Sequence, residues 1–173
     1  MLFRSDDPDY FRQLAPDFEL IPQEGYDLGE RLDHALTSYL ACGYQRAVIM
    51  DSDSPTLPAD YLSQAFDVLA AGADVILGPC DDGGYYLIGV TKPSPRLLRE
   101  VHMSTPTVAA ETIALAKEEG LNLISLPTWY DVDDVASLSR LRQEIEALDP
   151  SVAVHTRQFL QQGELQALLD HGV

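Results

Sequence analysis

The stretch from Val48 to Pro58 most constrains what this chain can form, because an apolar segment runs directly into two aspartates and a proline-bounded loop. A buried strand delivers the carboxylates that follow it to the carboxyl edge of a sheet, where open α/β folds bind their ligands. Asp51 and Asp53 are two residues apart, so on an extended chain they point the same way. Such neighbours repel each other unless a cation or hydrogen bonds compensate, and carboxylate oxygens are ligands that Mg2+ and Mn2+ prefer. The stretch therefore predicts a metal site; the alternative is a polar loop in which an Asp caps a helix starting at Pro58 or Ala59.

A second acidic segment, Cys80 to Gly89, follows an apolar strand predicted at Asp74 to Leu77. It contains two acids followed by Gly83 and Gly84, and paired glycines form a tight turn or let a ligand approach the backbone closely. Asp-Gly is also common hairpin turn chemistry, so the segment after it equally reads as a returning strand.

A third acidic segment, Asp131 to Asp134, follows a strand predicted at Asn122 to Leu126 and opens a helix predicted to run to Leu148. Aspartates at a helix start also cap free amides and stabilise the helix dipole, which is the competing interpretation.

Together these segments resemble the bacterial family of unknown function 2064, which is related to the nucleotide-diphospho-sugar transferases of glycosyltransferase type A fold. Family members are often labelled arsenosugar-biosynthesis-like glycosyltransferases. The motifs that carry the resemblance, in order, are Gln23 to Leu32, Asp51 to Pro55, Asp82 to Gly89, Ser104-Thr105 and Asp131 to Asp133. The resemblance implies an α/β fold of that type and a metal-dependent glycosyl or nucleotidyl transferase.

The resemblance also implies roles for individual residues. It makes Asp53 and Asp133 the ligands of a divalent metal, Mn2+ or Mg2+, and Asp82 the catalytic base or the residue that holds the acceptor. The expected substrate-binding residues, for a nucleotide sugar or a small-molecule acceptor, are Gly83, Gly84, Tyr85, Ser104 and Thr105. Tyr85 and Tyr86 alternate across a strand, so one is expected in the core and the other toward a sugar or base.

The sequence departs from the family pattern in two places. Family members usually begin with a strand, a basic loop of the form Gly-x-x-Lys-Thr-Arg and a helix, and nothing of this kind precedes Met1. Without that unit we expect weak nucleotide binding and, because a strand edge is left unpaired, a homodimer. Met103 stands where the family tends to have Trp.

The charge balance restricts the partners. The 173-residue chain has a formal net charge of -17, which disfavours nucleic acid and anionic membranes. An anionic nucleotide sugar therefore needs a metal to bridge its phosphates to the carboxylates. Two distant cysteines and the lack of a secretory or membrane-spanning apolar run predict a soluble, cytoplasmic protein.

Alternating strands and helices predict a single α/β domain over residues 1–173, with a mostly parallel sheet flanked by helices. The predicted strands are Glu19 to Ile21, Arg46 to Met50, Asp74 to Leu77, Tyr85 to Val90 and Asn122 to Leu126. The predicted helices are Asp27 to Ala41, Ala59 to Ala71, Thr107 to Glu119, Asp134 to Leu148 and Ser151 to His171.

Two other functions remain open at this point. One is a non-catalytic or partner-dependent remnant of the same fold. The other is a phosphatase of the haloacid dehalogenase type, whose motif also has two acids two residues apart. That motif requires a Thr where this chain has Pro55 and a later Lys, for which only Lys92 and Lys117 are available.

Overall fold

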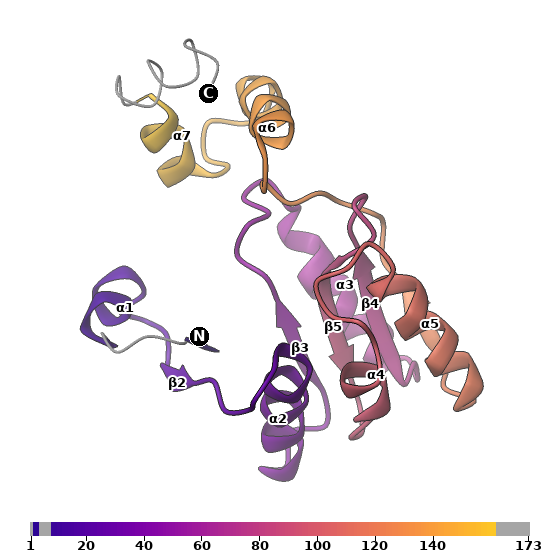
Figure 1. Cartoon of the computed structure of the whole chain (residues 1–173). Helices are drawn as coiled ribbons and strands as arrows, with labels where there is room; N and C mark the ends of the chain where they lie inside the picture. Colours follow the sequence, from indigo (N-terminus) through magenta and orange to yellow (C-terminus); the bar gives the residue numbers. More distant parts are fainter. Residues whose placement is uncertain (1, 4–7, 162–173) are drawn as a thin grey trace.

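A four-stranded sheet lies at the centre of the structure, a computed structural model that describes residues 2–3 and 8–161. Its strands, in spatial order, are β3 (Ala47–Met50), β5 (Tyr85–Val90), β4 (Val75–Pro79) and β6 (Leu123–Ser125). Figure 1 shows the three longest of these strands side by side. The α/β class predicted from the sequence is confirmed.

Strand β5 runs against both of its neighbours, β3 and β4, whereas β4 and β6 are parallel. Two of the three pairings are therefore antiparallel, and the expectation of a mostly parallel sheet is wrong in this respect. The reason lies in the connection, because residues 80–84 form a short hairpin turn, and a turn of this length joins only antiparallel strands. The hairpin interpretation of the Asp-Gly segment is the correct one.

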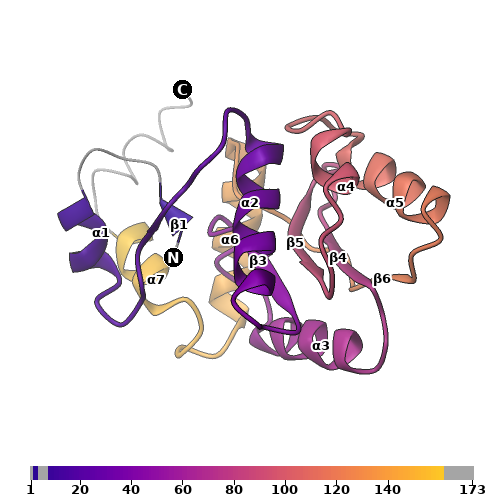
Figure 2. The ribbon, with the colours of Figure 1, turned by 90° about the horizontal axis from the view of Figure 1, so that it is seen from below.

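Helices cover both faces of this sheet. One face packs against α2 (Leu28–Ala41), α4 (Arg96–Arg99) and α5 (Val108–Glu118), and the other packs against α3 (Ala59–Ala70). Seen from below, α3 lies on one side of the strands and α4 and α5 on the other (Figure 2). Because side chains alternate along a strand, Leu77 packs in the first core and Ile76 in the second.

Three of the predicted helices end just before a glycine, as the sequence predicts. Gly43, Gly72 and Gly120 follow α2, α3 and α5 with φ angles of 97, 109 and 66°, a conformation that glycine adopts without steric cost. The fourth, α6 (Val135–Ala147), also lies within its predicted range. The four-residue helix α4 was not predicted, since it is too short for a periodic pattern.

Helices α1 (Pro8–Leu14) and α7 (Val154–Leu160) lie to one side of the main sheet, beyond β3 (Figure 1). Strands β1 (Leu2–Phe3) and β2 (Ile21–Pro22) form a separate two-stranded parallel sheet, with α1 (Pro8–Leu14) between them in the chain. Helix α7 (Val154–Leu160) corresponds to part of the predicted helix from Ser151, whose later portion lies outside the described residues. None of the described helices has the length and apolar character needed to cross a membrane.

Candidate active site at the acidic edge of the sheet

The strand ends bring three acidic segments to one edge of the sheet. Strands β3 and β4 both end at this edge and β5 begins there, since Met50 and Gly78 are each paired with Leu87. The ladder continues one residue past β3, where the Asp51 N–H donates to the Tyr86 carbonyl oxygen (2.9 Å). Loop 51–58, hairpin 80–84 and the segment after β6 therefore leave the sheet side by side.

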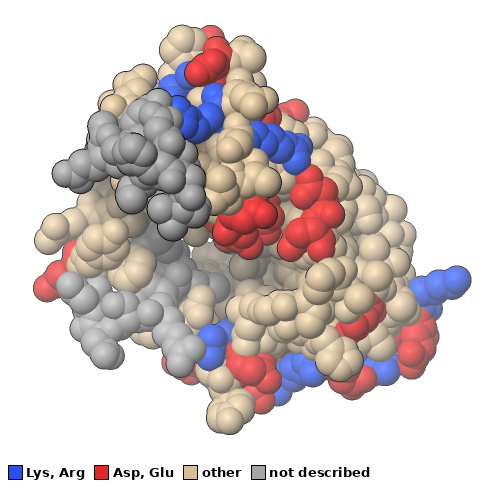
Figure 3. All heavy atoms as spheres, turned by 45° about the horizontal axis from the view of Figure 1, so that its top comes forward, with Lys and Arg blue, Asp and Glu red and all other residues tan. Residues whose placement is uncertain are grey.

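Five aspartates come from these segments, namely Asp51, Asp53, Asp82, Asp131 and Asp133, and the charges of their neighbours act on Asp51 and Asp131. Burial, followed by the charges of Asp53 and Asp131, raises the pKa of Asp51 to about 7. Burial and the charges of its neighbours also raise the pKa of Asp131. Acidic side chains gather in the middle of the corresponding face, beside a hollow (Figure 3). Burial and neighbouring acids therefore destabilise the ionised forms of Asp51 and Asp131.

Two buried oxygen atoms in this cluster have no hydrogen-bond partner among the described residues. They are Oδ1 of Asp51 and Oγ of Ser54. Buried oxygens are normally paired, so unpaired ones mark a place for a water molecule, an ion or a ligand group. Oxygen donors of this kind suit Mg2+ and Mn2+.

The acids after β3 do not cap the next helix. The N-cap of α3 is Pro58, and no side chain there accepts a hydrogen bond from the helix amides. This excludes the capping alternative for Asp51 and Asp53. At α6 the competing interpretation holds for one acid only, since Asp134 is the N-cap and forms a capping box with Ser137. Asp131 and Asp133 are left without a capping role.

The predicted metal ligands Asp53 and Asp133 lie on adjacent loops. The Val132 N–H donates to the Asp53 carbonyl oxygen (3.0 Å), so the two loops are joined directly next to both acids. Both side chains are exposed. Their role as metal ligands stays a prediction.

The glycines of the hairpin have structural roles that geometry explains. Gly83 has a φ angle of 95°, and a Cβ at this position would lie 1.9 Å from the carbonyl oxygen of Pro106. The space on the Cβ side of Gly83 is thus filled by the chain itself. The Gly84 N–H donates to Oδ1 of Asp82 (2.7 Å) and holds that carboxylate in place.

The two tyrosines of β5 point to opposite faces of the sheet, as the alternation of side chains along a strand requires. Tyr86 is fully buried, and its hydroxyl donates to the carbonyl oxygen of Pro127 (3.0 Å). Tyr85 is only partly buried and lies on the opposite face, where its hydroxyl contacts the sulfur of Met103 (3.6 Å). Of the two, Tyr85 is the one left accessible for a ligand.

Ser104 and Thr105 lie in a loop that packs against the hairpin. Ser104 is exposed and has a positive φ of 59°, which is unusual for a residue other than glycine. The Thr105 hydroxyl donates to the His102 carbonyl oxygen (2.7 Å), and the Ala109 N–H donates to the Gly83 carbonyl oxygen (3.1 Å). The structure therefore brings all the predicted substrate-binding residues to one edge of the sheet.

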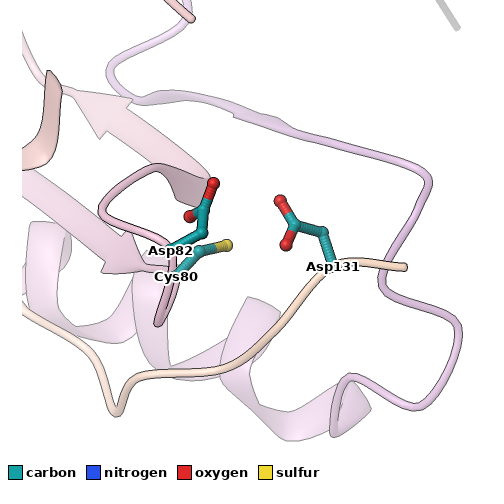
Figure 4. Close-up of side chains that lie close together, drawn as sticks. All are labelled: Cys80, Asp82 and Asp131. Atoms are coloured by element: carbon teal, nitrogen blue, oxygen red, sulfur yellow. The ribbon is translucent and has the colours of Figure 1, made fainter. Parts of the chain in front are cut away.

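Sequence reasoning missed two residues of this region, Cys80 and Asp131, which lie beside the predicted Asp82. Cys80, Asp82 and Asp131 have potential ligand atoms that all lie within 4.8 Å of one another. Figure 4 shows the three side chains pointing toward a common space. The guanidinium of Arg140 lies nearby, because it donates to Asp81 (2.6 Å) and stacks 3.7 Å from the Tyr130 ring centroid.

Neither lysine that a phosphatase of the haloacid dehalogenase type would require lies near the carboxylates. Lys92 forms an ion pair with Asp74 (2.9 Å) at the opposite end of the sheet. Lys117 is at the end of α5 beside Leu123, also at that opposite end. The geometry does not support the phosphatase alternative.

Comparison with known structures agrees with this fold. The chain is similar to a "putative nucleotide-diphospho-sugar transferase" from Desulfovibrio desulfuricans G20, with 31% identity, a TM-score of 0.83 and coverage of 98% of this chain and 73% of that one. It is also similar to molybdopterin-guanine dinucleotide biosynthesis protein A from Archaeoglobus fulgidus, with 15% identity, a TM-score of 0.51 and coverage of 85% and 79%, which shows the fold alone. No curated protein matches the chain.

The fold is therefore that of the nucleotide-diphospho-sugar transferases. Residues 2–105 match the family described as "Uncharacterized protein conserved in bacteria (DUF2064)", and the chain belongs to that family. The resemblance inferred from the sequence motifs is confirmed.

Proposed function

We propose that this protein is a metal-dependent transferase that acts on a nucleotide sugar or a related activated nucleotide in the cytoplasm. The observation that carries the proposal is the convergence of five carboxylates at the edge of a nucleotide-diphospho-sugar transferase fold. The unpaired oxygens of Asp51 and Ser54 support it, because the donor set fits a hard divalent cation.

In this proposal Asp53 and Asp133 hold Mn2+ or Mg2+ from two adjacent loops. A bound divalent ion supplies charge neutralisation for the leaving diphosphate, which the strongly acidic chain does not itself provide. Asp82, whose orientation is set by the Gly84 N–H, serves as the base or holds the acceptor. Tyr85, Ser104 and Thr105 contact the sugar or the acceptor.

The test is a calorimetric titration of the protein with uridine, guanosine, adenosine, cytidine and thymidine diphosphate sugars, in Mn2+ and again in EDTA. We expect at least one to bind in Mn2+ and none in EDTA. The proposal would be refuted if none of the five bound in Mn2+, or if binding were equally strong in EDTA.

Product analysis distinguishes the possible reactions. Release of a nucleoside diphosphate from a bound nucleotide sugar indicates glycosyl transfer, and release of pyrophosphate from a nucleoside triphosphate indicates nucleotidyl transfer. Binding without either product, over a panel of small-molecule acceptors, favours the non-catalytic remnant of the fold.

A further inference from the structure

Cys80 places a buried thiol against two of the carboxylates. Only 5% of its surface is exposed, and Sγ makes no hydrogen bond among the described residues. It projects toward the carboxylate of Asp131, with Asp82 beside it (Figure 4). A buried polar group aimed at two acids, without a partner of its own, is the arrangement that a cation would complete.

The positions of these three residues are fixed by the backbone. The Cys80 N–H donates to the Gly84 carbonyl oxygen (2.9 Å), which closes the hairpin around Asp82. On the other side the Trp129 N–H donates to Pro79 O (3.0 Å) and the Asp81 N–H donates to Trp129 O (3.0 Å). These two bonds hold the chain leading to Asp131 alongside the end of β4, so the three potential ligands come from two paired segments.

The distances suit a tetrahedral ion after a small contraction. Zinc binds thiolate sulfur at about 2.3 Å and carboxylate oxygen at about 2.0 to 2.2 Å, so neighbouring ligand atoms around it are roughly 3.3 to 3.7 Å apart. The atoms of Cys80, Asp82 and Asp131 are within 4.8 Å of one another, so side-chain movements of about 1 Å bring them to these distances. Three protein ligands leave a fourth position open.

The chemistry of the donors selects the ion. A thiolate favours soft or borderline cations such as Zn2+ and Co2+, whereas Mg2+ takes oxygen ligands almost exclusively. A cysteine thiol loses its proton when it becomes a metal ligand. Binding therefore releases the thiol proton to solvent as the sulfur–metal bond forms.

We propose that Cys80, Asp82 and Asp131 form a cation site with one thiolate ligand, which binds Zn2+ or Co2+ in preference to Mg2+. Its ligands differ from those of the Mn2+ or Mg2+ site assigned to Asp53 and Asp133. Because Asp82 is shared with the proposed reaction, an ion held here would occupy the carboxylate that the transfer needs.

The probe is Co2+ added to the metal-free protein, followed by absorption spectroscopy in the near ultraviolet, where thiolate-to-cobalt charge transfer appears. We expect a band that saturates at one equivalent, is displaced by Zn2+ and is unaffected by excess Mg2+. The Cys80→Ser variant should lose the band. Cys42→Ser, which removes the exposed cysteine, should retain it.

Three results would overturn the proposal: no charge-transfer band in the unaltered protein, a band that persists in Cys80→Ser, or displacement by Mg2+. Circular dichroism tests whether each variant is folded. If Cys80→Ser does not fold, the Asp131→Asn variant is used in its place, and it should weaken Co2+ binding. Asp53→Asn should keep the Co2+ band, so failure of the proposed transferase metal site and failure of this site are distinguishable.

Discussion

The main-chain N–H of Val132 donates a hydrogen bond of 3.0 Å to the carbonyl oxygen of Asp53, and this bond joins the loop after β3 to the segment after β6. The two loops come from opposite edges of the four-stranded sheet, since β3 and β6 are its outermost strands. The bond holds the backbones of the two loops together although 80 positions separate Asp53 from Asp133 in the numbering.

This arrangement predicts different effects for the two acids after β3. Asp53→Asn should abolish calorimetric Mn2+ binding to the metal-free protein, because the variant loses an exposed carboxylate at the meeting point of the two loops. Asp51→Asn should retain binding, because Asp51 is half-buried and is not one of the two assigned ligands. Asp67→Asn, an exposed change near the far end of α3, is the control. An unchanged titration for Asp53→Asn would exclude Asp53 as a ligand.

A second prediction concerns Gly83 in the hairpin turn. Gly72 has a similar backbone conformation but different surroundings, so it serves as the comparison. Gly72 and Gly83 have φ angles of 109 and 95°, so alanine is strained at either position, by about 1 to 2 kcal/mol. A Cβ at Gly72 meets nothing within 4 Å, whereas one at Gly83 would clash with Pro106. Gly83→Ala should therefore lower the free energy of unfolding, measured in urea, clearly more than Gly72→Ala. Equal losses would show that the hairpin can move away from Pro106 freely.

Most elements of the fold could be predicted from the sequence because their signals are local. The apolar period of α2 and the glycines after α2, α3 and α5 mark helices without knowledge of the rest of the chain. The sequence left open whether the Asp-Gly segment before β5 is a ligand-binding loop or a hairpin turn, and so it left open the direction of β5. It was settled by its register with β3 and β4, which is a long-range property.

Some residues of the candidate site could likewise be predicted from local sequence signals, and others could not. Asp51, Asp53, Asp82 and Asp133 could be singled out because acids that follow strands gather at the sheet edge. The proximity of Asp131 to Cys80 depends on an isolated bridge between Cys80 and Trp129, in which segments far apart in sequence are paired. No local pattern in the sequence predicts that bridge.

A third prediction concerns the hydrogen bond that anchors the segment leading to Asp131. Tyr86→Phe removes the donor to the Pro127 carbonyl oxygen and should lower the free energy of unfolding by about 1 kcal/mol. Tyr61→Phe is a matched control, since Tyr61 stacks on Tyr86 with ring centroids 6.3 Å apart and its hydroxyl makes no hydrogen bond among the described residues. Urea unfolding of both variants gives the comparison, and a loss of equal size in the control would assign the effect to ring packing.

The last prediction concerns the loop that carries Ser104 and Thr105, which Glu111 holds in place. The Glu111 carboxylate accepts hydrogen bonds from the His102 N–H (2.8 Å), the His102 ring (3.0 Å) and the Thr107 hydroxyl (2.7 Å). These bonds, chiefly that from the His102 N–H, lower the pKa of Glu111 to about 2.

Because the folded-state pKa lies below the unfolded one, Glu111 contributes stability that is fully present above about pH 4.5 and is lost as the pH falls toward 2. Glu111→Ala should therefore lower the melting temperature at neutral pH, and the gap from the unaltered protein should narrow as the pH falls through this window. Glu118→Ala is the control on the same helix, since Arg96 keeps Glu100 and Glu119 as partners. Thermal unfolding followed by circular dichroism at each pH gives the measurement. A gap that stays constant from neutral pH to pH 2 would mean that the ionised carboxylate does not stabilise this loop.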